Sequence, residues 1–561
     1  MKERYIALME KALSAYTDEH ILRYFNDVKT NGLKEHGFPR LTANIGILIA
    51  HGKRTYLLPT FIEMMNVCCK MFLRPYVHAA NEFSVREVLC CIAELEAAGT
   101  VDAEIISSWK RDLAAIKPEE CYNSYEKALS NQARNWAFFL ATSELFRQNA
   151  GLCESSELID SLIEQQLQWF DENGMYQDDK HQVNHQPIMY DIVARGLCVM
   201  LLHFGYEGKY RNEIDGYLKK SALLTLQMQS PNGEVAFGGR SNQFLHNEAW
   251  FAILFEYEAR RYVAEGNTEL AKCFKSANAR ALAVAEELLC KNPIRHIKNR
   301  FPTETKYGCE GYAYFDKYMI TVASFLYAAY LICDDSIEAP TAPDRDSAAF
   351  QTSHYFHKLF LKNGGYALEF DTSADTHYDA NGLGRVHREG APSPICLSCP
   401  CPAEPIYTVD IENPFALSLC STVRDKDAWR FGADKDTKYE VSEYSADESG
   451  ASATLLCKFA DNRTVREHYA VDESGISITV EGDDEIGYAL PAFCFDGEAS
   501  PEIKIDENTL TVSHEGWLCR YISDGKISDL NKIAANRNGH YRTFVASAQN
   551  TLNIKIEIIK A

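Results

Sequence analysis

The chain has 561 residues, of which 24% are charged, 46% are hydrophobic and 11% are aromatic. This composition is that of a folded globular protein, and it excludes disordered, collagen-like and disulfide-scaffold classes. The formal net charge of −22 would repel the phosphates of nucleic acids and the headgroups of anionic membranes. We therefore expect neither nucleic acid nor a membrane as a partner.

Apolar runs and cysteines bear on the cellular location. The longest uncharged apolar run, Met319 to Cys333, is too short to span a bilayer comfortably and predicts a buried helix. The first residues, Met1 to Tyr16, mix charged and apolar side chains and lack the apolar stretch of a signal peptide. The 18 cysteines are spread along the whole chain. Together these features predict a cytoplasmic protein with reduced thiols.

Helical periodicity dominates residues 1–335. Between Trp250 and Val263, apolar residues recur at intervals of three and four, which predicts an amphipathic helix with a wide apolar face. The same periodicity recurs over 155–170, 188–204, 214–229, 269–290 and 318–333.

A faint internal repeat suggests how these helices are arranged. Leu167-Gln168 followed by Asn173-Gly174 matches Leu226-Gln227 followed by Asn232-Gly233 at an offset of 59 residues. This period fits one antiparallel helix pair with its loops, so residues 1–335 hold about six pairs. Six pairs closed into a ring form an (α/α)6-type toroid, and an open array of helical hairpins is the alternative.

From residue 350 to 561 the pattern changes to alternation of apolar and polar residues. It is clearest over 365–370, 439–444, 453–458, 476–481, 509–513 and 552–558, with turn signals between these runs. Short alternating strands at this spacing predict an antiparallel β-sandwich. The segment between the two patterns contains Pro340 and Pro343. We therefore expect a toroid over 1–335, a linker over 336–349 and a sandwich over 350–561.

Four polar segments, 178–187, 238–248, 306–318 and 375–390, interrupt these patterns and are candidates for a functional site. Their candidate residues are Asn184, His185, Arg240, Asn242, His246, Glu248, Tyr312, Tyr314, His377, Asp379, Arg385 and His387. The alternative for each is structural: a polar loop, a helix cap or a satisfied core side chain.

The residue types in these segments suit carbohydrate chemistry. Four tyrosines surround two glycines in 306–318; aromatic rings stack on sugars, and a tyrosine hydroxyl can protonate a leaving oxygen. Asp379 could orient His377 as a base, and Arg385 could bind a carboxylate through two parallel hydrogen bonds. A structural zinc or calcium ion, with His377, Asp379 and His387 as ligands, is the competing interpretation of 375–390.

A helical toroid followed by an antiparallel sandwich resembles the polysaccharide lyases of the heparinase II/III and alginate-lyase type. Asn184-His185 is similar to the Asn-His pair of such uronate lyases, in which Asn neutralises the uronate carboxylate and His is base or support. His377-Tyr378-Asp379 is similar to the His-x-Asp segment that heparinase-type enzymes bring from the sandwich. The resemblance implies a catalytic tyrosine, Tyr312 or Tyr314, beside the catalytic histidines.

The leading hypothesis is a lyase that cleaves oligosaccharides next to a uronic acid by β-elimination, acting from a chain end. This reaction requires no cofactor. One alternative is a glycoside hydrolase, similar to β-glucuronidases or unsaturated-glucuronyl hydrolases, which would use two carboxyl groups. A sugar epimerase and a non-catalytic glycan-binding protein are further alternatives. The sequence leaves the oligomeric state, including a homo-oligomer, open.

Overall fold

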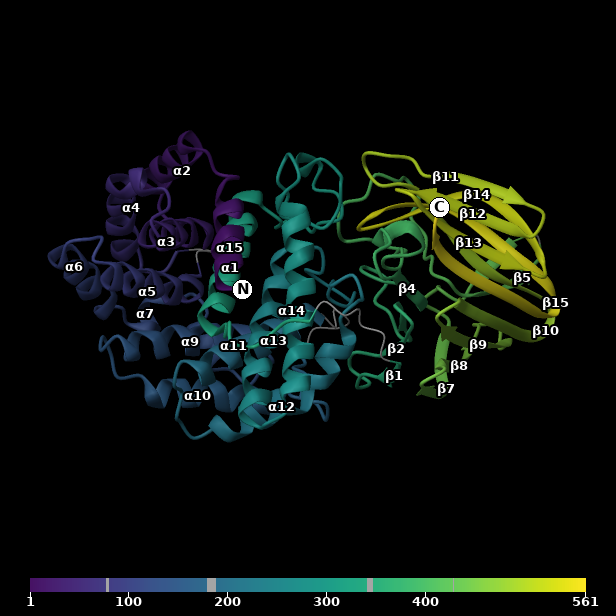
Figure 1. The fold of residues 1–561 in the computed structure, drawn as a ribbon, viewed down its shortest axis with the longest axis horizontal. Coiled ribbons are helices and arrows are strands. Elements are labelled where there is room, and N and C mark those ends of the chain that lie inside the picture. Colours follow the sequence, from purple (N-terminus) through teal and green to yellow (C-terminus); the bar gives the residue numbers. More distant parts are fainter. Residues whose placement is uncertain (77–79, 179–187, 341–346, 427) are drawn as a thin grey trace.

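The computed structural model describes residues 1–76, 80–178, 188–340, 347–426 and 428–561. Helices form one half of the molecule and strands the other (Figure 1). The helices are α1 (Lys2–Leu13), α2 (Asp18–Asn31), α3 (Gly37–Ala50), α4 (Leu58–Met71), α5 (Asn81–Ala98), α6 (Ala103–Ala114), α7 (Pro118–Cys121), α8 (Tyr125–Ala128), α9 (Asn135–Asn149), α10 (Ser156–Leu167), α11 (Ile188–His203), α12 (Arg211–Met228), α13 (His246–Ala264), α14 (Thr268–Leu289) and α15 (Phe315–Ile332).

Six helices form a closed inner ring. Helices α3, α5, α9, α11, α13 and α15 each contact the next one, and α15 contacts α3 to close the circle. Helices α4, α6, α10, α12 and α14 each cover the inner helix that precedes them, and α1 covers α15. The predicted toroid of six helix pairs is therefore confirmed, with its sixth pair formed by the two ends of the helical region.

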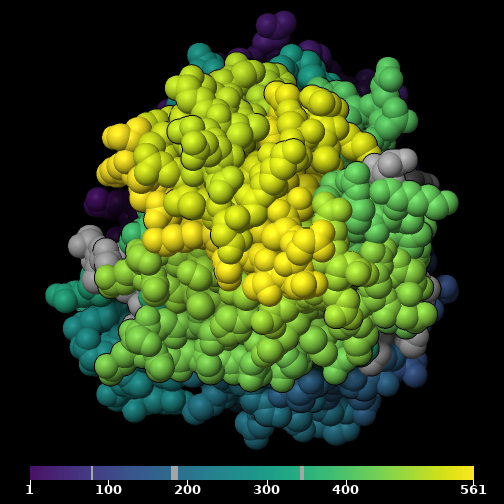
Figure 2. All heavy atoms as spheres, turned by 90° about the vertical axis from the view of Figure 1, so that its right-hand side faces the viewer, coloured from purple at the N-terminus to yellow at the C-terminus, as the bar shows by residue number. Residues whose placement is uncertain are grey.

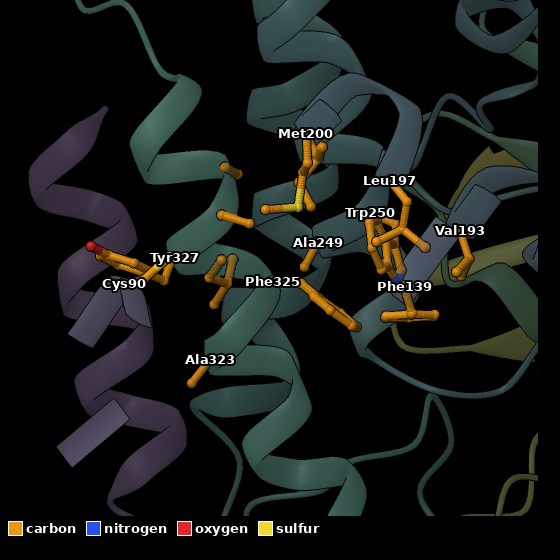
Figure 3. Close-up of a cluster of buried hydrophobic side chains, with 14 of the residues drawn as sticks. Cys90, Phe139, Val193, Leu197, Met200, Ala249, Trp250, Ala323, Phe325 and Tyr327 are labelled. Atoms are coloured by element: carbon orange, nitrogen blue, oxygen red, sulfur yellow. The ribbon is translucent and has the colours of Figure 1, made fainter. Parts of the chain in front are cut away.

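Burial distinguishes inner from outer helices. Every residue of α3 from Gly37 to Ile49 is buried, whereas the outer helix α6 buries one face with Ile106, Trp109 and Leu113. Inner helices are covered on all sides, so an amphipathic pattern is not required of them. Side chains of several inner helices meet in one apolar cluster around Trp250 (Figure 3).

The sequence repeat marks equivalent turns after two outer helices. Gly174 follows α10 with a φ of 76°, and Gly233 follows α12 with a φ of 92°. A Cβ atom at these positions would lie 2.2 Å from the carbonyl oxygen of Tyr217 and 2.4 Å from that of Arg280, respectively. Each glycine thus lets its turn pack against the backbone of the next outer helix.

The strands form two antiparallel sheets. The smaller one has the order β1-β2-β3-β4, and the larger one contains the other eleven strands. The strands are β1 (Ala348–Gln351), β2 (Lys358–Asn363), β3 (Tyr366–Asp371), β4 (Gly382–Arg388), β5 (Ser421–Asp425), β6 (Ala428–Phe431), β7 (Lys438–Asp447), β8 (Gly450–Lys458), β9 (Thr464–Asp472), β10 (Gly475–Phe495), β11 (Glu502–Asp506), β12 (Thr509–His514), β13 (Trp517–Ser523), β14 (Lys526–Asn536) and β15 (Gly539–Lys560).

The smaller sheet lies between the toroid and the larger sheet (Figure 1). Leu359 and Leu361 of β2 belong to the sandwich core, whereas Phe360 between them packs on the core of the toroid. Successive side chains of a strand point to opposite faces. Strands β2 and β3 are accordingly buried along their whole length, whereas β9 alternates between buried and exposed positions.

The predicted fold class, an N-terminal helical toroid followed by an antiparallel sandwich, is confirmed. The last helix ends at Ile332, before the segment 336–349 predicted as linker, and the first strand begins at Ala348, inside that segment. Viewed from the sandwich side, the strands cover much of the end of the helical ring (Figure 2). No helix among the described residues is long and apolar enough to cross a membrane.

Candidate functional site

The N-terminal ends of the inner helices lie together at the end of the ring that faces the sandwich. The ring of His36 before α3 lies 5.7 Å from that of Phe83 in α5 and 6.2 Å from that of Tyr318 in α15. Phe83 in turn contacts Trp136 of α9, whose side chain is 38% exposed. We call this aromatic-lined end of the toroid the mouth. Aromatic rings in such a position suit the stacking of sugar rings.

Segment 235–241, which leads into α13, is held against the mouth by the sandwich, and we call it the anchor loop. The backbone N–H of Gly239 donates to Asp379 Oδ2 at 2.8 Å, and the N–H of Phe237 donates to Glu369 at 3.1 Å. Arg537, in the turn between β14 and β15, donates to the carbonyl of Gly239 and to Glu310. Three segments far apart in sequence therefore fix the backbone of this loop.

Tyr312 lies at the centre of the contacts that the anchor loop makes with the mouth. Its hydroxyl lies 2.5 Å from Ser241 Oγ and accepts a 3.2 Å hydrogen bond from Arg240 Nε. The Arg240 guanidinium also lies 4.8 Å from the centre of the Tyr312 ring. The hydroxyl of Tyr190, in the first turn of α11, reaches Ser241 Oγ at 3.2 Å.

Burial keeps these tyrosines protonated. It raises the pKa of Tyr312 well above its usual value, and the neighbouring Tyr190 and Glu310 add to this effect while Arg240 opposes it. Burial also raises the pKa of Tyr190. Both hydroxyls are therefore neutral near neutral pH, and a neutral hydroxyl at a reaction centre can donate a proton.

Arg240 supplies the positive charge beside Tyr312, and it forms no ion pair with any described residue. Its side chain is partly exposed, and its neighbours are neutral hydroxyls rather than carboxylates. A guanidinium with unused donors beside an aromatic mouth is suited to binding a carboxylate.

His377 lies in the sandwich segment that also carries Asp379, two residues before the carboxylate that accepts from Gly239. Its side chain is 51% exposed, and its Nδ1 lies 2.8 Å from Asp375 Oδ1, while its Nε2 lies 3.7 Å from Glu404. An ionised carboxylate only accepts, so Asp375 fixes the proton on Nδ1 and leaves Nε2 as the basic atom. The carboxylate that orients His377 is therefore Asp375 and not Asp379, which holds the anchor loop.

The other polar residues of 238–248 are less accessible. His246 is 7% exposed, and its ring lies 5.2 Å from that of Phe244 and 5.6 Å from that of Tyr318, which stack on each other at 4.2 Å. Burial and the charges of Arg40 and Lys298 hold its pKa well below the usual value, so the ring is neutral. Glu248 is fully buried and paired with Lys298 at 2.9 Å, and Asn242 donates to the carbonyl of Ala236 within the loop.

Arg385 and His387 lie on the face of the small sheet that packs on the toroid. Arg385 is buried and donates to the carbonyls of Ser398 and Val235, and His387 Nδ1 lies 2.7 Å from Ser230 Oγ. Burial lowers the pKa of His387 to about 3, and it is therefore neutral at physiological pH. These two residues join the halves of the molecule rather than line the mouth, because strand alternation directs them into the interface.

Two tyrosine candidates of 306–318 differ in position. Tyr312 sits beside Arg240, whereas Tyr314 is 54% exposed, with Lys306 Nζ 5.4 Å from the centre of its ring. Asn184 and His185 lie outside the described residues. Of the described residues on either side, Tyr190 contacts Ser241, and Asp178 accepts from the backbone N–H of Asn135 at the start of α9.

Sequence reasoning missed Arg537, Asp375 and Ser241. Arg537 carries no motif, and only its place in an Asn-Arg-Asn-Gly turn after alternating residues marks it. Ser241 has a φ of 66°, which sequence does not reveal for a serine. Among the described residues, no three His, Cys, Asp or Glu side chains lie close enough together to hold a metal ion.

Comparisons with known proteins concern the fold. No protein-family model and no curated protein sequence matches the chain. The crystal structure of heparinase III matches 100% of this chain and 85% of its own, with a TM-score of 0.53 and 10% sequence identity. Heparan sulfate lyase HepC from Pedobacter heparinus matches with a TM-score of 0.50 and 9% identity, over 86% of this chain and 68% of that one. The predicted resemblance to heparinase-type polysaccharide lyases thus holds at the level of architecture.

Proposed function

We propose that the protein is a carbohydrate lyase that cleaves a glycosidic bond next to a uronic acid by β-elimination. The observation that carries the proposal is Arg240, a guanidinium with no carboxylate partner among the described residues, in contact with the neutral hydroxyl of Tyr312. The fold shared with heparinase III and HepC supports the same class of reaction. Because one fold can host several reactions, the reaction is inferred from the residues of the site.

In this mechanism Arg240 binds the uronate carboxylate. Removing the proton at C5 places negative charge on that carboxylate, and a fixed guanidinium stabilises it. His377 Nε2 takes the C5 proton, with Asp375 holding the ring in the required tautomer. Asn184 and His185 are the residues that the family resemblance would add.

The bond between C4 and the leaving oxygen then breaks, and a double bond forms between C4 and C5. Tyr312 supplies the proton that the leaving oxygen needs, because burial keeps its hydroxyl protonated. Ser241 contacts that hydroxyl and Tyr190 contacts Ser241, so a proton can return to Tyr312 through these two hydroxyl groups. No water is added to the sugar.

Hydrolysis is less well supported, because it requires two carboxyl groups on either side of the scissile bond. The described acidic side chains that the sequence offered for hydrolysis are already engaged by protein groups. The pairs are Asp178 with Asn135, Asp191 with Arg195, Glu234 with Ser393, Glu248 with Lys298, Glu310 with Arg537 and Asp316 with His20.

The substrate we propose is a short uronate-containing oligosaccharide, attacked from its end. The sandwich lies over the end of the ring that carries the mouth (Figure 2), and the net charge of −22 opposes the approach of a long polyanion. Action in the cytoplasm and without a cofactor belongs to the same proposal.

The decisive experiment analyses the products of unsulfated glucuronate-containing oligosaccharides. A lyase yields a 4,5-unsaturated uronate with a new ultraviolet absorption, whereas a hydrolase yields a saturated sugar and incorporates oxygen from ¹⁸O-labelled water. Release of an unsaturated disaccharide from the first turnover onward supports end-wise elimination. Saturated products carrying ¹⁸O would refute the proposed reaction, and early accumulation of mid-length fragments would refute end-wise action.

A further inference from the structure

A cavity of about 480 Å³ lies between the toroid and the sandwich. Its walls include Val284 and Lys291 from α14 and the segment after it, Arg300, and Ser393, Trp517 and Asn538 from the sandwich. A cavity of this volume accommodates one or two sugar units. None of the mouth residues His36, Phe83, Trp136 or Tyr312 lines it.

One layer of residues separates this cavity from the candidate site. Gln243 donates to the carbonyl of Arg537 and to the side chain of Asn538, which lines the cavity. The guanidinium of Arg537 points the other way, to Gly239 and Glu310. The cavity and the mouth therefore lie on opposite sides of the β14–β15 turn.

The charges on the cavity wall differ from those of the mouth. The three lining cations are all paired: Lys291 with Glu287 at 3.1 Å, Lys298 with Glu248 at 2.9 Å and Arg300 with Asp496 at 3.0 Å. An anionic ligand would have to compete with these carboxylates. An uncharged sugar can donate hydroxyl hydrogens to the carboxylates and accept from the cations without breaking the pairs.

Trp517 supplies the apolar surface that such a sugar needs. It begins β13 and is partly exposed, with its ring 3.7 Å from the place where a Cβ atom on Gly390 would stand. A side chain at Gly390 would thus contact the indole, and Lys560 Nζ lies 5.6 Å from the centre of its ring. Glu248, behind the wall residue Lys298, also leaves Oε2 without a hydrogen-bond partner among the described residues.

We propose that this cavity is a second, non-catalytic glycan-binding site, which takes an uncharged pyranose unit stacked on Trp517. It would hold a neutral part of a glycan while the mouth acts on a uronate. The proposal does not require that the mouth be a lyase, because binding at Trp517 involves none of the catalytic side chains.

The test measures binding by calorimetry to the full chain carrying Tyr312→Phe, which should slow turnover strongly. The probes are the β-1,4-linked tetramers of N-acetylglucosamine and of glucose, and a glucuronate-containing tetrasaccharide. We expect at least one neutral tetramer to bind, and Trp517→Ala to weaken that binding at least about tenfold. Trp429→Ala is the matched control, since Trp429 is also partly exposed on the same sheet with a cation over its ring.

A second variant keeps the test decisive if Trp517→Ala does not fold. Val284→Phe fills the cavity from the helical wall and leaves the sandwich untouched, and it should weaken the same binding by a similar factor. The proposal is overturned if neither neutral tetramer binds, or if binding survives both Trp517→Ala and Val284→Phe. If the neutral tetramer binds through Trp517 but the wild-type chain forms no unsaturated product, the lyase is refuted and this site stands.

Discussion

At the scale of single residues, Tyr312 and Tyr314 are two positions apart but have different surroundings. Tyr312 contacts Arg240 and Ser241, whereas Tyr314 is largely exposed. We predict that Tyr312→Phe lowers kcat by about 10² to 10⁴ with the fold intact, because it removes one proton-transfer group and keeps the ring. The measurement is the rate of unsaturated-product formation, together with the thermal unfolding midpoint.

Tyr314→Phe is the matched control for this prediction, and its kcat should stay within about twofold of the wild type. A Tyr312→Phe enzyme with wild-type turnover would remove the tyrosine from the proposed mechanism. A large loss in Tyr314→Phe alone would move the acid to the exposed tyrosine.

The second prediction concerns the two aspartates close to His377 in sequence. Asp375 contacts Nδ1 of His377, and Asp379 accepts from the backbone of Gly239. Asp375→Asn presents an NH₂ group to Nδ1 and favours the wrong tautomer, so kcat should fall by roughly 10². Asp379→Asn still offers an oxygen to Gly239 and should keep most of the activity. The pH profile of kcat/KM checks the assignment, and the reverse ranking of the two variants would contradict it.

From the sequence, the residue types of the candidate site were easier to predict than the directions in which their side chains point. The sequence pointed to Arg240 and Tyr312, which the structure places in contact, because polar residues crowd loops next to helices. It also pointed to Arg385 and His387, which the structure buries between the two halves. The local sequence pattern does not reveal that both faces of β4 are covered. Buried residues of that strand are therefore wrongly predicted to bind substrate.

At the scale of elements, the repeated turns depend on glycine. In Gly174 and Gly233 the φ values are positive, and an added Cβ atom would meet the carbonyl oxygen of the next outer helix. We predict that Gly174→Ala destabilises the protein by at least about 1 to 3 kcal/mol, from the backbone strain alone. The measurement is the free energy of unfolding in denaturant.

Gly216, inside α12, is the control on the neighbouring outer helix. Nothing lies within 4 Å of a Cβ atom added there, so Gly216→Ala should stabilise the helix by roughly 0.5 to 1 kcal/mol. Equal effects of the two substitutions would show that contact with Tyr217 does not govern the turn.

The elements themselves could largely be predicted from their periodicity. The expected helix at 214–229 is α12, and the expected strand at 509–513 is β12. Ring closure could not be predicted, because it depends on α15 meeting α3 and on α1 covering α15. The hydrogen bond between Asn44 of α3 and Ser324 of α15 joins residues 280 positions apart, and no local pattern encodes it.

At the scale of the whole molecule, the two halves meet across a charged surface. Lys358, Glu369 and Asp371 of the small sheet lie on the toroid side, in a network that includes Arg385. Such a buried network costs desolvation and adds little net stability, but it fixes geometry when every member is paired. Here it fixes the anchor loop, so the sandwich is a structural part of the site in the toroid.

Glu369 makes this junction sensitive to pH. Burial raises the pKa of its carboxyl from 4.5 to about 7, although Arg385 and Lys358 oppose the shift. Between these values the unfolded chain releases the proton and the folded chain keeps it, so the contribution of Glu369 to stability falls as pH rises from 4.5 to about 7. Above about pH 7 this contribution to stability is fully lost, and below pH 4.5 it is fully present.

Glu369→Gln removes this titration and can still accept from the backbone of Phe237. We therefore predict that the free energy of unfolding of the variant, relative to the wild type, increases between about pH 4.5 and pH 7 by up to roughly 3 kcal/mol. Denaturant unfolding at several pH values measures it, with the exposed Glu412→Gln as a control whose difference stays constant. A pH-independent difference for Glu369→Gln would mean that this carboxyl is already ionised at the junction, and that its charge is held by Arg385 and Lys358.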